Sequence, residues 1–253
     1  MAYRKLLPVA LGVLALSWAV PSAAQTTLDL DEFFAEFAKK REGIQMLRAP
    51  FTQLSVTTDD KVTSTGHIIY ARPKRIVLRY DGFEDAGDAM VYLTDGKVYY
   101  EYDEESRQLQ SWKIEDRPGT EALFFGFSDD SARLRDAYDM FLRPPEDGGG
   151  GVELELRPLD ADSGESGFEK IVLQLRKKDL LPTKIYLVND AESNMTIQVG
   201  VFSINRGDGS DATLLVPEGT EILHDDEYVE TTGPEGVRVP RPNPGANDNG
   251  SAP

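Results

Sequence analysis

The sequence contains no cysteine. This absence excludes disulfide bonds, thiolate-ligated metal sites and a lipid-modified N-terminal cysteine. Imidazole groups are almost as scarce, because His67 and His224 are the only histidines. We interpret His67, which lies in a predicted strand, as structural. The acidic residues that follow His224 are interpreted as a solvated run and not as a metal site, so no metal or other cofactor is expected.

The sequence also lacks the motifs of common catalytic and nucleotide-binding sites. The segment 163–167 has neither the spacing nor the strand-to-helix context of a nucleophile elbow. The segment 208–211 departs from the EF-hand pattern, and the glycine run 148–151 has no phosphate-loop lysine. We therefore expect a protein that is not an enzyme.

The sequence contains fewer basic than acidic residues. The 27 lysines and arginines stand against 44 aspartates and glutamates, which gives a formal net charge of −17. This balance argues against nucleic acid as a partner and against passive adhesion to anionic membranes. It is compatible with docking to a basic partner surface, and equally with solubility in a salty exterior.

Long apolar runs are absent beyond the N-terminus. There, two basic residues precede an apolar stretch over 6–20, and small residues at 22–24 form a cleavage site. We predict that residues 1–24 are a cleaved signal peptide. The rest of the chain is then soluble in an exported compartment, and it is long enough to bury a core without disulfides.

The first helix signal in the remaining chain is an apolar stripe at helical spacing, formed by Leu30, Phe33, Phe34 and Phe37. Asp29 can cap this helix, and Glu32 is placed to complete a capping box. The pattern predicts a helix over about 29–41. Its aromatic stripe is typical of a helix that covers a sheet, and a lid would have the same pattern.

Strand signals dominate the chain after this helix. Segments rich in β-branched and aromatic residues predict strands at 51–58, 65–71, 75–81, 90–94, 97–102, 107–113, 139–143, 152–157, 168–176, 183–188 and 195–203. Their short connections favour antiparallel neighbours. Asp95-Gly96 predicts a two-residue type I′ hairpin. The fold class predicted is mainly β: a single curved, unclosed antiparallel half-barrel covered by a few short helices.

One face of such a sheet has to be covered. Alternation places Glu153, Glu155, Gln174 and Arg176 on a wet face. The other face has only the helix at 29–41 and a second helical region at about 120–138 to cover it. This geometry favours an apolar cavity, although a fully packed core is an open alternative. We assign residues 25–229 to this domain and predict a disordered tail at 230–253.

Several segments together resemble the LolA family of periplasmic lipoprotein carriers. They are Phe51-Thr52-Gln53, Gly66 followed by Tyr70-Ala71-Arg72-Pro73, Val91 to Lys97 with Tyr100, Trp112, the 120–127 segment, and Leu215 to Thr220. The resemblance runs in colinear order over about 28–225. It departs from the family in the acidic loop 81–88, the glycine run 148–151, the segment 160–167 and the tail.

The resemblance implies a periplasmic carrier that shields the acyl chains of lipoproteins. By the same resemblance, the partners are acylated lipoproteins, an inner-membrane ABC exporter and an outer-membrane acceptor, and we expect a monomer. Two alternatives are open: a carrier of glycolipid or another amphiphile, and a non-enzymatic envelope-stress sensor that binds lipidated ligands.

The resemblance also implies site residues. Arg72 lines up with the family's arginine before proline, which ties the lid helices to the barrel, and a guanidinium fork suits backbone carbonyls at a helix end. The remaining lipid-binding or lid candidates are Ile76, Leu78, Tyr80, Phe33, Phe37, Leu123, Phe124 and Phe127.

Overall fold

The structure is a computed structural model that describes residues 29–81, 90–114, 131–145, 150–159, 168–207 and 209–240. The helical elements are α1 (Leu30–Glu42), α3 (Ser131–Ala137) and η3 (Ser210–Ala212). The strands are β1 (Met46–Val56), β2 (Lys61–Ala71), β3 (Arg75–Tyr80), β4 (Met90–Thr94), β5 (Val98–Asp103), β6 (Gln108–Lys113), β7 (Tyr138–Arg143), β8 (Gly151–Pro158), β9 (Lys170–Arg176), β10 (Pro182–Val188), β11 (Asn194–Val199), β12 (Ser203–Ile204), β13 (Leu214–Val216), β14 (Glu221–His224), β15 (Glu227–Thr231) and β16 (Val237–Val239).

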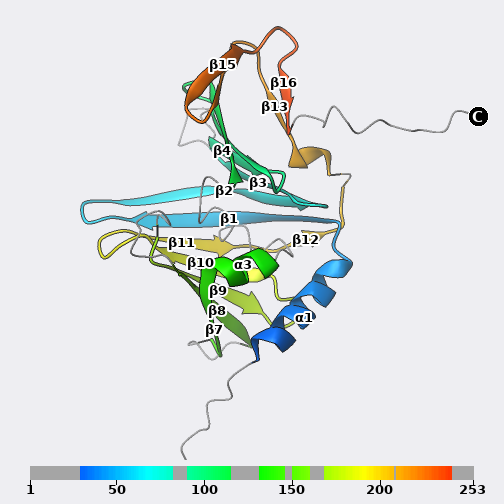
Figure 1. The fold of residues 1–253 in the computed structure, drawn as a ribbon, viewed down its shortest axis with the longest axis vertical. Coiled ribbons are helices and arrows are strands. Elements are labelled where there is room, and N and C mark those ends of the chain that lie inside the picture. Colours follow the sequence, from blue (N-terminus) through cyan, green and yellow to red (C-terminus); the bar gives the residue numbers. More distant parts are fainter. Residues whose placement is uncertain are drawn as a thin grey trace, which may run out of the picture.

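One large curved sheet forms the body of the protein (Figure 1). Its strand order is β15-β14-β6-β5-β4-β3-β2-β1-β11-β10-β9-β8-β7, and β12 pairs with one end of β1. The pairs are antiparallel except for β14 beside β6. The described strands leave the sheet unclosed, with β15 and β7 at its edges. The predicted fold class, an unclosed and mainly antiparallel sheet with few helices, is confirmed.

The long strand β1 holds the two halves of the sheet together. It pairs with β2 over its whole length and with β11 from Phe51 to Val56. Gly66 of β2 lies opposite Phe51 of β1. A Cβ atom at position 66 would collide with the Phe51 ring and with the backbone of β3. Glycine at position 66 therefore lets the Phe51 side chain lie flat against the sheet.

Alternating residues of β2 and β3 pack into two separate cores. Ile68 and Leu78 belong to the main core on the concave side, together with α1 and strands β8–β11. Their neighbours Ile69 and Val77 belong to a second core on the opposite face. Because successive side chains of a strand point to opposite faces, both faces of this half of the sheet are covered.

The C-terminal segment covers that second face, which corrects the prediction of a disordered tail from residue 230. β16 pairs with β13, and Val239 is buried in the second core. β15 begins before the predicted boundary and forms the edge of the main sheet. The prediction rested on the lack of apolar periodicity after residue 230. This periodicity is lacking because β16 is only three residues long and buries Val239 alone. Residues 241–253 lie outside the described residues, as do residues 1–24.

The predicted wet face is also wrong at two positions. Glu153 and Glu155 in β8 are buried, with only 6% and 3% of their surfaces exposed. Arg143 of β7 and Arg157 flank Glu155, and each forms an ion pair with its carboxylate. The long arginine side chains fold over the carboxylates and shield them from water. The alternation in the sequence therefore predicts the face of the sheet on which the glutamates lie, but not that they are buried.

The hairpin at Asp95-Gly96 differs from the prediction as well. Its loop spans three residues between β4 and β5, and Gly96 is the residue with a positive φ, 86°. The Asp95 carboxylate accepts hydrogen bonds from the backbone N–H groups of Lys97 and Val98. A type I′ turn needs positive φ at both central residues, and the Asp95 side chain stabilises a different turn here.

Helix α1 forms as predicted and lies against the concave side of the sheet (Figure 1). The Asp29 carboxylate caps it by accepting hydrogen bonds from the N–H groups of Asp31 and Glu32. Phe33, Phe34 and Phe37 are all buried in the main core. No helix in the described part of the chain is long and apolar enough to cross a membrane.

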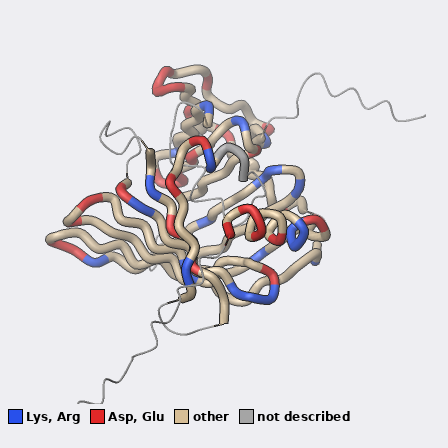
Figure 2. Tube along the Cα trace, turned by 60° about the horizontal axis from the view of Figure 1, so that its bottom comes forward, with Lys and Arg blue, Asp and Glu red and all other residues tan. Residues whose placement is uncertain are grey.

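Charged residues lie mainly along hairpin ends and loops, with acidic and basic positions interspersed (Figure 2). The middle parts of the strands are mostly uncharged. This distribution leaves the interior of the curved sheet to apolar and aromatic side chains.

Candidate functional site

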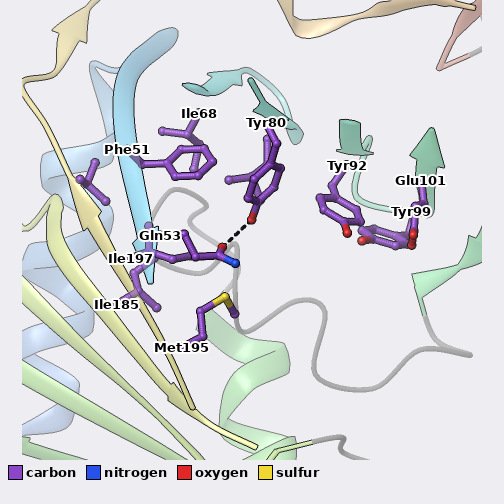
Figure 3. Close-up of a pocket in the computed structure, with 12 residues that line it drawn as sticks. Phe51, Gln53, Ile68, Tyr80, Tyr92, Tyr99, Glu101, Ile185, Met195 and Ile197 are labelled. Atoms are coloured by element: carbon purple, nitrogen blue, oxygen red, sulfur yellow. Dashed lines mark hydrogen bonds between the residues drawn. The ribbon is translucent and has the colours of Figure 1, made fainter. Parts of the chain in front are cut away.

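A cavity of about 390 Å³ opens on the concave side of the sheet (Figure 3). It is lined by Phe51, Gln53, Ile68, Leu78, Tyr80, Tyr92, Tyr99, Glu101, Ile185, Met195, Ile197 and Val199. This volume is at the lower end of the roughly 300–1,000 Å³ of small-molecule sites. The lining is predominantly aliphatic and aromatic, so the cavity suits an apolar guest.

Two parts of the chain that are far apart in sequence form its walls. One wall comes from β1 to β5, and the other from Ile185 of β10 and from Met195 and Ile197 of β11. The curvature of the sheet about β1 brings these walls to face each other (Figure 3). A flat sheet with the same residues would have no such cavity.

Aromatic rings form a continuous row along the first wall. Ring centroids are 5.0 Å apart for Phe51 and Tyr80, 5.6 Å for Tyr80 and Tyr92, and 6.0 Å for Tyr92 and Tyr99. Trp112 of β6 stacks on Tyr99, also at 6.0 Å. Such edge-to-face and stacked pairs stabilise the wall beyond the area they bury.

Polar groups of the cavity are few and mostly hydroxyls. The Tyr80 hydroxyl donates a hydrogen bond of 2.7 Å to Oε1 of Gln53 (Figure 3). Burial raises the pKa of Tyr80, and the neighbouring Tyr92 adds to the shift. Burial, with the negative charges of Glu101 and Asp103, raises the pKa of Tyr92 to about 12. Both hydroxyls are therefore protonated at neutral pH.

Arg72 joins the β2–β3 turn to the C-terminus of α1. Its Nε donates to the carbonyl oxygen of Ile44 at 2.8 Å, and its Nη2 donates to that of Arg41 at 2.9 Å. We name these two hydrogen bonds the Arg72 latch. They occupy carbonyl groups at a helix end, where the helix itself provides no donors.

A second connection, from α1 to the β9–β10 turn, was not predicted. Nη2 of the buried Arg41 donates to the carbonyl oxygen of Leu180 at 2.9 Å, and its guanidinium lies 4.4 Å from the centroid of Phe37. Lys40 donates to the carbonyl oxygen of Lys177 at 2.7 Å. The signal in the sequence was a cation at helical spacing after Phe37, on the apolar stripe itself.

Helix α1 is thus held on both halves of the sheet. The Arg72 latch fixes it to the β2–β3 side, and Arg41 and Lys40 fix it to the β9–β10 side. Asn205, next to β12, adds a hydrogen bond from its side-chain amide to the carbonyl of Gly43. The helix therefore bridges the open side of the sheet at this end.

The structure brings some of the predicted site residues together and separates others. Leu78 and Tyr80 line the cavity. Ile76, Phe33 and Phe37 lie in the main core, and none of them is among the lining residues. Leu123, Phe124 and Phe127 lie outside the described residues.

The site residues predicted from the sequence include none of the second wall and none of the aromatic row beyond Tyr80. Tyr92 and Tyr99 alternate with buried or outward-facing residues in β4 and β5, which was the available signal. Glu101 shares the face of Tyr99 and is the one carboxylate among the described lining residues. Within the described ranges, no cluster of three or more histidine, aspartate or glutamate residues could hold a metal ion.

No protein family model matches the sequence, and no curated protein matches it either. Among solved structures, a LolA superfamily protein from Nitrosomonas europaea is 8% identical, with a TM-score of 0.39 over 70% of this chain and 94% of that one.

Two further solved structures show comparable similarity. A domain assigned to outer membrane lipoprotein sorting in Vibrio parahaemolyticus is 13% identical, with a TM-score of 0.45 over 71% of this chain and 94% of that one. An uncharacterized protein from Thermus thermophilus is 10% identical, with a TM-score of 0.47 over 77% of this chain and 98% of that one.

Proposed function

We propose that the protein is a periplasmic carrier that takes an acyl chain of a lipoprotein into the cavity between β1–β5 and β10–β11. In this proposal it receives lipoprotein from an inner-membrane ABC exporter and delivers it to an outer-membrane acceptor. The carrier is not an enzyme and needs no cofactor. The cavity on the concave face of the sheet is the observation that carries the proposal.

The energetics of acyl chains support a shielding role. Each methylene group moved out of water contributes about 0.8 kcal/mol, so eight buried methylenes contribute roughly 6 kcal/mol. The wall residues Ile68, Ile185 and Ile197 supply the aliphatic contacts for such a chain. A free acyl chain would otherwise expose the same surface to water during the transfer.

Loading and release require the cover of the sheet to move, and the Arg72 latch is suited to that task. Its two hydrogen bonds hold backbone carbonyls at the end of α1 without burying the whole arginine side chain, which is only partly buried. They can break and re-form without leaving a charge stranded in the core. We propose that breaking them lets α1 shift when a chain enters.

The proposal is tested by incubating the purified chain with vesicles that carry a labelled lipoprotein. We expect the lipoprotein to appear in the soluble fraction as an equimolar complex with the carrier. The control variant is Ile197→Asp, which places an unpaired charge in the cavity wall and should abolish extraction. Retention of all lipoprotein in the vesicles, at every carrier concentration, would refute the proposal.

A further inference from the structure

The inner face of β1 changes from apolar to polar within the cavity. Phe51 is buried, with 3% of its surface exposed. The next residues on the same face of the strand, Gln53 and Ser55, are polar and only partly buried. A polar group beside an apolar cavity can fix the orientation of a guest and provide specificity.

The strands on both sides of β1 show that this change lies at the mouth of the cavity. In β2, the partly buried Ser64 lies opposite Gln53. In β11, Ile197 lies opposite Gln53 and is buried. Met195, which lies opposite Ser55, is partly exposed. Exposure therefore increases from Gln53 toward the β1–β2 hairpin, and Gln53 lies where the enclosed part of the cavity begins to open.

Two hydrogen bonds hold the amide group of Gln53. Its Oε1 accepts a hydrogen bond of 2.7 Å from the Tyr80 hydroxyl, and its Nε2 donates one of 3.0 Å to Oγ of Ser55. Burial raises the pKa of Tyr80, so at neutral pH this hydroxyl keeps the proton that it donates. Figure 3 shows the amide between Tyr80 and Met195, projecting from β1 into the cavity. The two bonds thus fix which end of the amide faces which partner.

The amide nitrogen of Gln53 can donate a further hydrogen bond to a guest. Among the described residues it donates to Ser55 alone, and this bond uses one of the two hydrogens on Nε2. A guest at the mouth therefore meets an uncharged donor beside an apolar wall. The carbonyl oxygen of an ester or amide is a matching acceptor, whereas an alkyl ether has no carbonyl group to place there.

We propose that Gln53 binds the carbonyl group of the acyl chain, a role that rests on the proposed carrier function. The hydrocarbon beyond the carbonyl then lies against Phe51 and Ile68, which are buried lining residues. The polar part of the guest lies at the mouth, near Ser55. The cavity thus prefers chains that are joined to their head group through an ester or amide over chains that are joined through an ether.

The expected size of this preference is modest. A hydrogen bond between two uncharged groups replaces hydrogen bonds that both groups make to water, so its net effect on a binding constant is roughly two- to tenfold. Gln53 is only partly buried, and water at the mouth competes for the same groups. We expect the ester to bind roughly three- to fivefold more tightly than the matching ether.

The experiment compares 1-lauroylglycerol with 1-O-dodecylglycerol, which have the same head group and chain length and differ in the carbonyl group. It uses a chain that begins at Gln25, where Trp112 is the one tryptophan. A bromoalkyl glucoside in the cavity quenches Trp112, and displacement of this probe by either glycerol lipid restores the emission. All three amphiphiles are kept below their micelle concentrations. The ratio of the two displacement constants measures the preference for the carbonyl.

Two variants with the same chemical change assign this preference to a residue. Gln53→Leu removes the donor, so the ratio should fall to about one while the affinity for the ether is maintained. Retained binding of the ether also shows that the variant is folded. Gln198→Leu is the matched control, because Gln198 alternates with the lining residues Ile197 and Val199 and is exposed on the opposite face of β11. This control should preserve the ratio.

The outcomes distinguish this role of Gln53 from the proposed carrier function. Equal affinities for ester and ether in the native protein, or an unchanged ratio in Gln53→Leu, would overturn the role of Gln53 and leave the carrier function intact. A loss of the preference in Gln198→Leu as well would show that it does not depend on Gln53, which also overturns the inference. If no amphiphile quenches Trp112 or displaces the probe, the carrier function fails, and the role of Gln53 fails with it.

Discussion

Nε of Arg72 lies 2.8 Å from the carbonyl oxygen of Ile44, so the β2–β3 turn is hydrogen-bonded to the chain just beyond the end of α1. The neighbouring nitrogen Nη2 reaches the carbonyl of Arg41 within the helix. This relationship predicts effects on the stability of the protein and on the proposed transfer of lipoprotein.

Replacing Arg72 by leucine should leave the protein folded but loosen α1. Hydrogen bonds from charged donors contribute about 1.5–3 kcal/mol each when well buried, and the partial exposure of Arg72 lowers this figure. We expect a loss of about 1–3 kcal/mol in the free energy of unfolding, measured by urea denaturation. Hydrogen exchange of residues 30–42 should accelerate more than that of β8–β10.

The same variant tests the latch in function. Without the two hydrogen bonds, the lipid-free state with α1 held to the β2–β3 turn is less stable relative to the lipid-bound state. Arg72→Leu should therefore take up lipoprotein but fail to pass it to the acceptor. Arg72→Lys is the matched control: it keeps the charge but lacks the fork that reaches two carbonyls. Normal transfer by Arg72→Leu in a reconstituted assay would contradict the role of the latch.

Arg41 should matter more for stability than its neighbour Lys40. Arg41→Ala leaves the carbonyl of Leu180 without its donor and opens space beside Phe37. We expect a loss of about 2–4 kcal/mol for Arg41→Ala, against less than about 1 kcal/mol for Lys40→Ala, in the same urea titration. Equal effects would show that the buried arginine is not the main connection to the β9–β10 turn.

The C-terminal strand gives a prediction by truncation. Removing residues 237–253 deletes β16, which exposes Leu214 and Val216 of the second core. The melting temperature should fall by several degrees. Removing only residues 241–253 should leave it unchanged, and a similar fall in both truncations would contradict the assignment of this packing to β16.

Alkaline titration tests the environment of the cavity tyrosines. The pKa of Tyr92 is about 12 in the folded protein, and that of Tyr80 is raised as well. An unfolded tyrosine has a pKa near 10. Above about pH 10 the unfolded state therefore binds fewer protons than the native state, and the free energy of unfolding falls as the pH rises toward 12.

The measurement compares the native protein with Tyr92→Phe. Near-ultraviolet absorbance should show a late-ionising class of tyrosines that becomes smaller in the variant. The decline of stability above pH 10 should also be shallower. Ionisation of all tyrosines together near pH 10 in the folded protein would mean that the aromatic row is open to water.

Local signals in the sequence were sufficient for most of the fold. The stripe ending at Phe37 predicted α1, and the strand signal over 168–176 predicted β9, in which Ile171, Leu173 and Leu175 are buried. These patterns repeat within a few residues, so they need no knowledge of distant partners. The role of Arg72 was implied by the resemblance to a family and not by a local pattern, because its donors meet carbonyls 28 and 31 residues away in the chain.

Features that depend on contacts between distant parts of the chain could not be predicted from such local patterns. β16 is stabilised by β13, and Glu155 is buried because Arg143 and Arg157 close over it. The cavity itself depends on β3–β5 facing β10–β11, which no local pattern reveals. Sequence alone therefore indicated an apolar interior but misplaced part of its lining, with Ile76 in the core and Tyr92 and Tyr99 on the wall.

Entry of an acyl chain into the cavity can be measured by contact quenching of Trp112. Trp112 stacks on Tyr99 of the cavity wall. A brominated acyl chain should quench its emission in a saturable manner, the same chain without bromine should not quench, and Ile197→Asp should abolish the effect. An emission that is unchanged by the brominated chain at every concentration below micelle formation would contradict the account.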